Sequence, residues 1–302
     1  MIFFNCSLIL VGLEVAVKPV TITTEQYKIW RGSYRISNGI VDLVVVPQVG
    51  RIMRFAEVGK PNLLWEGDQE QARATKPGGW ANWGGDKVWP APQDLWGWPP
   101  EREYDGVAWT VKPIRNGVRM TSKTPTAKLG VRFERTILLN NSSTSVEITN
   151  TLINDSIKSQ RLSVWEVCQV DDPKECILPV WKSKNHPNGW SVYHGDKVDG
   201  LVRELGHELH VTRDLKRGLK YGSGSPTGEI TAIVGNYSIT MGSPFDIEKD
   251  YPDGGNAQQL YTSANPNRYA ELELVGPLTT LAPGKSASIR VMISLKRNET
   301  SN

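Results

Sequence analysis

From about Tyr34 onward, hydrophobic and polar residues alternate in short segments, which is the pattern of β-strands with one buried face. Turn residues separate these segments, for example at Asn140-Asn141 and Pro283-Gly284-Lys285. The pattern predicts strands over residues 34–37, 40–47, 51–56, 109–112, 118–121, 131–139, 146–153, 162–170, 230–235, 237–242, 269–275 and 288–295. Many strands with no convincing helix between them, except a weak pattern over residues 69–74, predict a mostly antiparallel all-β sandwich or barrel.

Two stretches interrupt this alternation. Residues 68–103 are rich in Trp, Gly and Pro, and a loop of that length inside a compact domain is usually functional. Residues 171–228 are polar and contain all four histidines, so we expect a lid over one sheet or a long insertion there.

The composition singles out tryptophan, because the 302 residues include 11 Trp against 9 Tyr and 5 Phe. Five of the tryptophans fall in the first of the two stretches: Trp80, Trp83, Trp89, Trp96 and Trp98. An indole has a large apolar face and an N–H donor, which suits stacking on a sugar ring, although indoles also close the ends of sandwiches. With Asn82, Asp86, Lys87 and Gln93 among them, we interpret the cluster as the wall of a binding site. A net charge of +3 gives no reason to expect nucleic acid or membrane partners.

Glutamates occur within two of the predicted strands, where side chains alternate between faces. On strand 269–275 one face carries Tyr269, Glu271, Glu273 and Val275, and the apolar Ala270, Leu272 and Leu274 face the core. On strand 162–170 one face carries Leu162, Val164, Glu166 and Cys168, and the other carries Ser163, Trp165, Val167 and Gln169. Burial of a glutamate would raise its pKa and suit it to acid–base catalysis, although a surface position is the commoner case.

Cysteine, histidine and the N-terminal residues carry weaker signals. Cys6, Cys168 and Cys176 lack metal-ligand spacing and are expected to be buried thiols, with a Cys168–Cys176 bridge as the alternative in an oxidising compartment. The pair His207 and His210 does not predict a metal site. We therefore expect neither a metal nor a cofactor. Residues 1–24 are apolar without a clear cleavage site, so they are a leader or an extension, and location in the cytoplasm or outside it stays open.

The order of several short motifs resembles the galactose mutarotase-like (aldose 1-epimerase-like) superfamily, and within it a subgroup with a Gly-Gly-x-x-x-Trp-x-x-Pro signature. The matching segments are residues 45–52, Gly84-Gly-Asp-Lys-Val-Trp-Pro-Ala-Pro-Gln93, residues 148–154, Trp165-Glu166, residues 270–273 and Leu281-Ala-Pro-Gly-Lys-Ser286. The resemblance implies one large β-supersandwich over residues 25–296, after the extension of residues 1–24 and before a polar tail at residues 297–302.

The resemblance also implies a function. In mutarotases a histidine protonates the ring oxygen of a sugar and a late glutamate removes the anomeric proton, and Glu273 or Glu271 falls at that late position. The strand expected to carry the histidine has none, so Glu166, Lys87 or a histidine of residues 171–228 replaces it, or the protein binds sugar without epimerising it. The candidate catalytic residues are Glu273, Glu166, Glu271 and Lys87, and the candidate binding residues are Trp80, Asn82, Trp83, Asp86, Trp89, Gln93, Trp165 and Gln169.

Three functions therefore stand as hypotheses. The first is an aldose 1-epimerase-like enzyme, the second is a non-catalytic carbohydrate-binding or sensing domain, and the third is a polysaccharide lyase or glycoside hydrolase on the same scaffold. All three predict a mono- or oligosaccharide as the partner.

Overall fold

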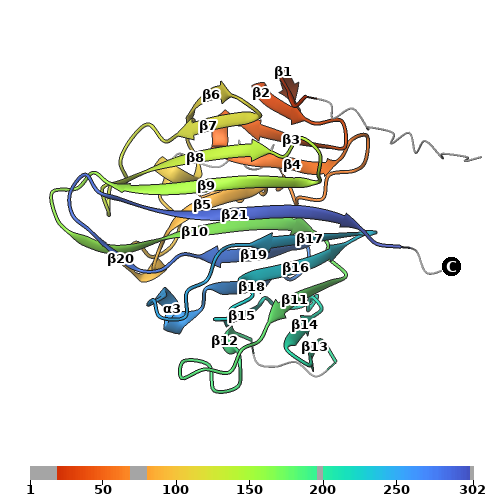
Figure 1. The fold of residues 1–302 in the computed structure, drawn as a ribbon, viewed down its shortest axis with the longest axis vertical. Coiled ribbons are helices and arrows are strands. Elements are labelled where there is room, and N and C mark those ends of the chain that lie inside the picture. The colour runs from red at the N-terminus through yellow and green to blue at the C-terminus, as the bar shows by residue number, and fades with distance from the viewer. Residues whose placement is uncertain (1–18, 69–79, 196–199, 300–302) are drawn as a thin grey trace, which may run out of the picture.

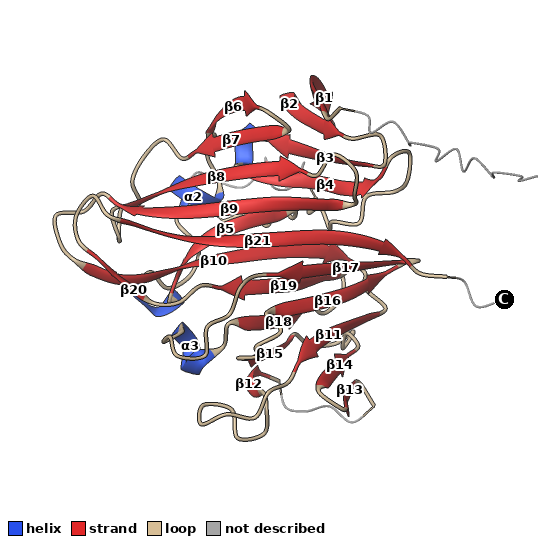
Figure 2. Ribbon diagram, in the orientation of Figure 1, coloured by secondary structure: helices blue, strands red, loops and turns tan. Residues whose placement is uncertain are grey.

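Two large antiparallel sheets form the molecule in a computed structural model that describes residues 19–68, 80–195 and 200–299 (Figures 1 and 2). The strands are β1 (Thr21–Tyr27), β2 (Trp30–Ser37), β3 (Val41–Val46), β4 (Arg51–Glu57), β5 (Asp86–Ala91), β6 (Thr110–Ile114), β7 (Gly117–Thr121), β8 (Val131–Leu139), β9 (Ser145–Asn154), β10 (Gln160–Asp171), β11 (Glu175–Pro179), β12 (Ser191–His194), β13 (Val202–Leu205), β14 (Glu208–Val211), β15 (Leu219–Ser223), β16 (Glu229–Val234), β17 (Tyr237–Gly242), β18 (Gln258–Thr262), β19 (Tyr269–Val275), β20 (Thr279–Leu281) and β21 (Ser286–Arg297). The short helical elements are η1 (Pro47–Val49), η2 (Gln93–Leu95), α2 (Arg102–Asp105) and α3 (Pro252–Gly255).

The strands divide between the sheets in a way that joins distant parts of the chain. The first sheet has the order β1-β2-β3-β4-β5-β10-β19-β18-β15-β12, with β20 paired to β10. The second has the order β13-β14-β11-β16-β17-β21-β9-β8-β7-β6. Strand β10 lies in the middle of the first sheet, between β5 and β19, so three segments far apart in sequence meet there.

The hydrophobic core fills the space between the sheets, because alternate residues along the strands point into that space. Strands β8 and β9 alternate buried and half-buried residues along their whole length, as a strand with one solvated face does. In the first sheet, Leu272 and Leu274 of β19 join the core, whereas Glu271 and Glu273 lie on the opposite, outer face. The structure thus confirms the predicted mostly antiparallel all-β sandwich and every one of the twelve strands predicted from alternation.

The two stretches that interrupt the alternation are more ordered than expected. Residues 68–103 contain β5, a central strand of the first sheet, and residues 171–228 contain β11 to β15, which extend both sheets. The predictions of a loop and of a lid were wrong in these parts, because pairing with neighbouring strands overrides the Gly, Pro and polar content. The weak helical pattern at residues 69–74 lies outside the described residues.

Strand β5 begins at a tight junction that requires glycine. Gly84 and Gly85 both have positive φ angles, of 87° and 72°. A Cβ atom at Gly84 would lie 2.2 Å from the Trp65 carbonyl oxygen, and one at Gly85 would lie 2.4 Å from the Ile52 carbonyl oxygen. Both backbone conformation and close packing therefore exclude a side chain at the start of β5.

Other expectations concern single residues and the chain ends. Cys168 and Cys176 are free buried thiols, as predicted, whereas Cys6 and the rest of residues 1–18 lie outside the described part. Strand β1 begins at Thr21 and β21 ends at Arg297. None of the described helices has the length and apolar character needed to cross a membrane.

Candidate functional site

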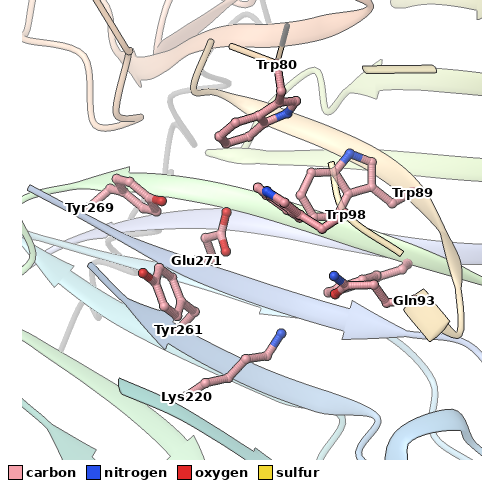
Figure 3. A pocket seen from close by; sticks show the side chains of 9 residues that line it. Trp80, Trp89, Gln93, Trp98, Lys220, Tyr261, Tyr269 and Glu271 are labelled. Carbon is pink, nitrogen blue, oxygen red and sulfur yellow. The ribbon is translucent and has the colours of Figure 1, made fainter. Parts of the chain in front are cut away.

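A pocket opens on the outer face of the first sheet, and aromatic side chains form most of its lining (Figure 3). Its volume is about 300 Å³, within the range of small-molecule sites. We call it the aromatic pocket; its lining residues are Trp80, Trp89, Gln93, Trp98, Trp165, Lys220, Tyr261, Tyr269 and Glu271. Figure 3 shows the three indoles of residues 80–98 on one side, Tyr261, Tyr269 and Lys220 on the other, and Glu271 between them.

Strand register brings the floor of this pocket together. Across the central strands, Trp89 of β5 pairs with Trp165 of β10, and Gln169 of β10 pairs with Glu271 of β19. Tyr261 of β18 then lies opposite Glu271. Because directly paired residues share a face of the sheet, their side chains all project to the outer side.

Two ion pairs of the same arrangement lie at the floor of the aromatic pocket. Glu271 lines the pocket, and its Oε1 lies 3.5 Å from the Nζ of Lys87, whose side chain is only 3% exposed. Lys220 also lines the pocket, and its Nζ donates to Glu273 Oε2 at 2.9 Å, with the Glu273 side chain 0% exposed. Each group that faces the pocket is therefore backed by a buried group of opposite charge.

The pocket-facing carboxylate of Glu271 is also held on one side only. Its Oε1 accepts a hydrogen bond of 2.8 Å from Gln169 Nε2, in addition to the contact with Lys87. The described residues donate no hydrogen bond to its Oε2. That oxygen is the one able to accept a proton or a hydrogen bond from a ligand.

Both buried partners have shifted pKa values. Burial raises the pKa of Glu273 to about 7, although the ammonium of Lys220 and the indole N–H of Trp165, at 2.9 Å from Oε2, oppose the shift. Burial also lowers the pKa of Lys87, while Glu271 opposes that shift, and the Lys87 ammonium lies 4.4 Å from the ring centre of Trp89. The site thus holds a carboxyl group that titrates near neutral pH.

This shift predicts a pH dependence of stability that the variant Glu273→Gln lacks. The pKa of Glu273 is 4.5 in the unfolded chain and about 7 in the folded protein. Between pH 4.5 and pH 7, the folded protein therefore keeps a proton that the unfolded chain has released. The free energy of unfolding should therefore fall for the wild type relative to the variant, by at most about 1.4 kcal/mol per pH unit from 4.5 to 7, and level off above 7. Urea denaturation at several pH values measures this difference, with the exposed Glu229→Gln as control. Parallel curves for wild type and Glu273→Gln would contradict the assigned shift.

Asp105 fixes two of the pocket indoles from behind. Its Oδ2 accepts a hydrogen bond of 2.8 Å from Trp80 Nε1, and its Oδ1 accepts one of 2.7 Å from Trp89 Nε1. The same Oδ1 lies 2.7 Å from the buried guanidinium of Arg51, which also donates to the Gly84 carbonyl at 2.7 Å. The pocket wall and the start of β5 therefore depend on one buried carboxylate.

The tryptophans of the cluster lie in different places and have different roles. Trp98 is 58% exposed and meets the Trp80 ring at a centre distance of 4.7 Å, at the mouth of the pocket. Trp96 is buried behind Trp89, and its Nε1 donates to the Pro90 carbonyl. Trp83 packs on Trp30 at 5.9 Å and does not line the pocket.

Four more of the candidate residues lie near the pocket or behind it. Gln169 is buried at the floor beside Glu271, and Asn82 Oδ1 accepts a hydrogen bond from the Gly84 N–H. Asp86 and Glu166 point the other way, into the space between the sheets, where both contact the buried guanidinium of Arg135. Glu166 also accepts a hydrogen bond from Asn150, and burial raises its pKa, followed by the nearby charge of Asp86.

The structure places Glu166 in a buried polar network of the core and does not bring it to the pocket. Alternation along β10 causes this separation, since Trp165 and Glu166 are neighbours in sequence and face opposite sides of the sheet. Of the candidate residues, the structure groups Lys87, Glu271 and Glu273 with Trp80, Trp89, Trp165, Gln93 and Gln169.

His186 and His210 lie away from the aromatic pocket, whereas His194 of β12 pairs with the pocket residue Lys220 without lining the pocket itself. Buried His186 contacts Asn256 and lines another cavity, and His210 on β14 contacts Glu175 and Glu208. Across residues 19–68, 80–195 and 200–299, no three His, Cys, Asp or Glu side chains are grouped to hold a metal ion.

Sequence reasoning missed several residues of this site. Lys220, Tyr261 and Asp105 come from segments that were interpreted as loops or not assigned at all. Strand alternation at β15, where Leu219 and Tyr221 are buried on either side of Lys220, was the signal that could have found the lysine.

By sequence, the chain matches no protein-family model and no curated protein. By structure, it aligns with a galactose mutarotase-like protein from Clostridium acetobutylicum at a TM-score of 0.59 and 13% identity, over 92% of this chain and 99% of that one. A galactose mutarotase-like protein from Lactobacillus casei aligns at a TM-score of 0.56 and 14% identity, over 88% and 100% of the chains. An Escherichia coli protein provisionally described as an aldose 1-epimerase aligns at 0.55 and 13% identity, over 92% and 99%.

The protein therefore has the galactose mutarotase-like fold, as its motifs suggested.

Proposed function

We propose that the protein binds a saccharide in the aromatic pocket and interconverts the anomers of a free sugar by acid–base chemistry. The observation that carries this proposal is the pair of opposite charges facing one aromatic pocket, Glu271 and Lys220, each backed by a buried counter-ion. Indole and phenol faces suit the apolar faces of a pyranose, and the charged groups suit its hydroxyls.

The reaction uses both pocket-facing groups. Glu271 Oε2 removes the proton of the anomeric hydroxyl while Lys220 donates a proton to the ring oxygen, and the bond between that oxygen and the anomeric carbon breaks. The open-chain aldehyde turns and closes through its other face, as Lys220 takes the proton back from the hydroxyl and Glu271 returns its own to the anomeric oxygen. Protons balance over one cycle, so no cofactor is consumed.

The buried partners hold these two groups in place. Lys87 lies against Glu271, and Glu273 accepts a hydrogen bond from Lys220. Glu273 and Lys87 are therefore positioning residues in this proposal, and Glu271 and Lys220 contact the sugar.

A non-catalytic carbohydrate-binding role is the second candidate. No histidine is present among the described lining residues, although the resemblance implies one as the acid. Binding without turnover would favour this alternative.

The wall of the pocket provides the test of sugar binding. Replacing Trp98 by alanine removes an exposed stacking face, and we expect affinity for a bound sugar to fall roughly twofold to tenfold, since such aromatic contacts contribute about 0.5–1.5 kcal/mol. The control is Leu95→Ala, which changes an exposed apolar residue of the same segment that does not line the pocket. Calorimetry against a panel of aldoses measures both variants. Failure of every sugar to bind the wild type would overturn the proposed function.

A further inference from the structure

A second cavity lies near the other end of β15, and its charge differs from that of the aromatic pocket. Its volume is about 440 Å³, and we call it the basic pocket; its lining residues are Trp181, Lys182, Ser183, Lys184, Asn185, His186, Gly224, Phe245, Ile247, Lys249, Tyr251 and Gly255. Among the residues that the structure describes, three lysines and no acidic side chain contribute to this lining; Lys249 is paired with Asp246 at 3.5 Å, so Lys182 and Lys184 are the lysines that would meet an anion. Such a surface favours an anionic group.

The two pockets lie at opposite ends of β15. Lys220 and Gly222 are on the outer face of β15, Leu219 and Tyr221 face the core, and Gly224 follows directly after the end of the strand. Lys220 lines the aromatic pocket and Gly224 lines the basic pocket. Four residues of extended chain separate them by about 13 Å, which is longer than one pyranose ring.

Tyr193 and Asn256 pack on Gly222 of β15, between Lys220 and Gly224. A Cβ atom at Gly222 would lie 2.4 Å from Asn256 Oδ1 and 2.8 Å from Tyr193 Cε2, so these side chains rest directly on the glycine. The Tyr193 ring is 38% exposed, and its centre lies 5.5 Å from the Lys220 ammonium. An aromatic surface therefore continues from one pocket toward the other.

Hydrogen bonds connect Asn256 and Tyr193 to the residues of the basic pocket. Asn256 Oδ1 accepts hydrogen bonds of 2.8 Å from His186 Nε2 and 2.8 Å from Ser191 Oγ, and the buried His186 lines the basic pocket. Tyr193 donates to the Asp253 carbonyl at 3.1 Å. This network fixes the basic pocket relative to Lys220.

The walls of the basic pocket also include aromatic surface. Phe245 and Tyr251 stack at a centre distance of 4.8 Å and an angle of 24°, and Trp181 is 43% exposed. Aromatic faces beside lysines suit a sugar ring that carries a negative group.

From this arrangement we propose that the natural ligand is an anionic oligosaccharide. Its reducing-end residue occupies the aromatic pocket, where anomer interconversion needs a free anomeric carbon, and a carboxylate or sulfate of a later residue occupies the basic pocket. The inference rests on the proposed function, because it names the substrate class of the same site.

The test compares ligands of different length and charge by calorimetry on the full chain. The probes are glucuronic acid, a tri- and a tetrasaccharide of uronic acids, a sulfated tetrasaccharide, and neutral oligosaccharides of the same lengths. We expect an anionic oligosaccharide to bind at least tenfold more tightly than glucuronic acid or a neutral oligosaccharide of its length. A gain with only the carboxylated or only the sulfated series identifies the anionic group.

A double variant, Lys182→Gln with Lys184→Gln, tests the basic pocket. It should weaken anionic oligosaccharide binding roughly threefold to tenfold and leave monosaccharide binding unchanged, because two partly exposed charge contacts are lost. The matched control is Lys112→Gln with Lys296→Gln, two exposed lysines that do not line the basic pocket. The extra affinity of the wild type should also decrease at high salt.

The possible outcomes distinguish a failure of this inference from a failure of the proposed function on which it rests. Equal affinity for a monosaccharide and for every longer or charged ligand would overturn the basic pocket as a subsite and leave sugar binding in place. An unchanged affinity of the double variant for anionic oligosaccharides would also overturn it. Absence of binding by all the saccharides would overturn the proposed function itself.

Discussion

Replacing Asp105 by alanine is expected to lower the free energy of unfolding by about 3–5 kcal/mol, because the buried guanidinium of Arg51 loses its counter-ion. The indole N–H groups of Trp80 and Trp89 lose their acceptor in the same step. Since both indoles line the aromatic pocket, ligand affinity should fall together with stability. Urea denaturation and calorimetric titration measure the two effects.

Two further variants serve as comparisons for Asp105→Ala. Asp94→Ala, at an exposed position in the same region, should change stability by no more than about 0.5 kcal/mol. Asp105→Asn keeps the shape and one acceptor oxygen but not the charge, so we expect it to fold with an intermediate stability and weakened binding. A loss below about 1 kcal/mol in Asp105→Ala would show that Asp105 does not compensate the Arg51 charge.

Replacing Glu271 by glutamine should reduce the protein-catalysed rate of anomer interconversion by about 10²–10⁴-fold, the usual contribution of a general acid or base. The amide keeps the size of the side chain and can still accept a hydrogen bond, so sugar affinity should change much less than the rate. Exchange NMR on an equilibrated aldose measures the interconversion, after subtraction of the spontaneous rate in the same buffer without protein.

Glu273→Gln and Glu229→Gln distinguish direct from indirect roles. Glu273 is buried behind Lys220, so its variant should lose less activity than Glu271→Gln and should lose any rate inflection near pH 7. Glu229 is exposed at the start of β16, and its variant should keep the wild-type rate. A wild-type rate in Glu271→Gln would remove this residue from the chemistry, and a larger loss in Glu273→Gln would move the base to that position.

Alternation predicted most of the fold because one solvated face leaves a period of two in the sequence. Strands such as β8 and β9 keep that period over their full length. Strand β5 does not, because all six of its residues are buried and the polar Asp86 on its inner face meets Arg135 of the second sheet. Strands β11 to β15 are short, and pairing partners far away in the chain define them.

The sequence predicted which face of a single strand the site glutamates occupy, but not which strands lie next to one another. The placement of Glu271 and Glu273 on the face opposite Leu272 followed from one strand alone. Lys87 and Gln169 were candidates by residue type, but only the pairing of β5, β10 and β19 brings them to Glu271. Alternation at β15 could have placed Lys220 on the outer face but not beside Glu273, and nothing local indicates the contacts of Asp105 with distant segments.

The glycine pair at the start of β5 has a consequence for tracing this site in other chains. Gly84 and Gly85 are required by backbone packing against Trp65 and Ile52, and neither lines the aromatic pocket. A chain that shares them would share the entry into β5 and thus the direction in which its Lys87 and Trp89 equivalents project. Substrate preference would vary independently of the two glycines, through residues such as Lys220 and Lys182 that lie far from them in sequence.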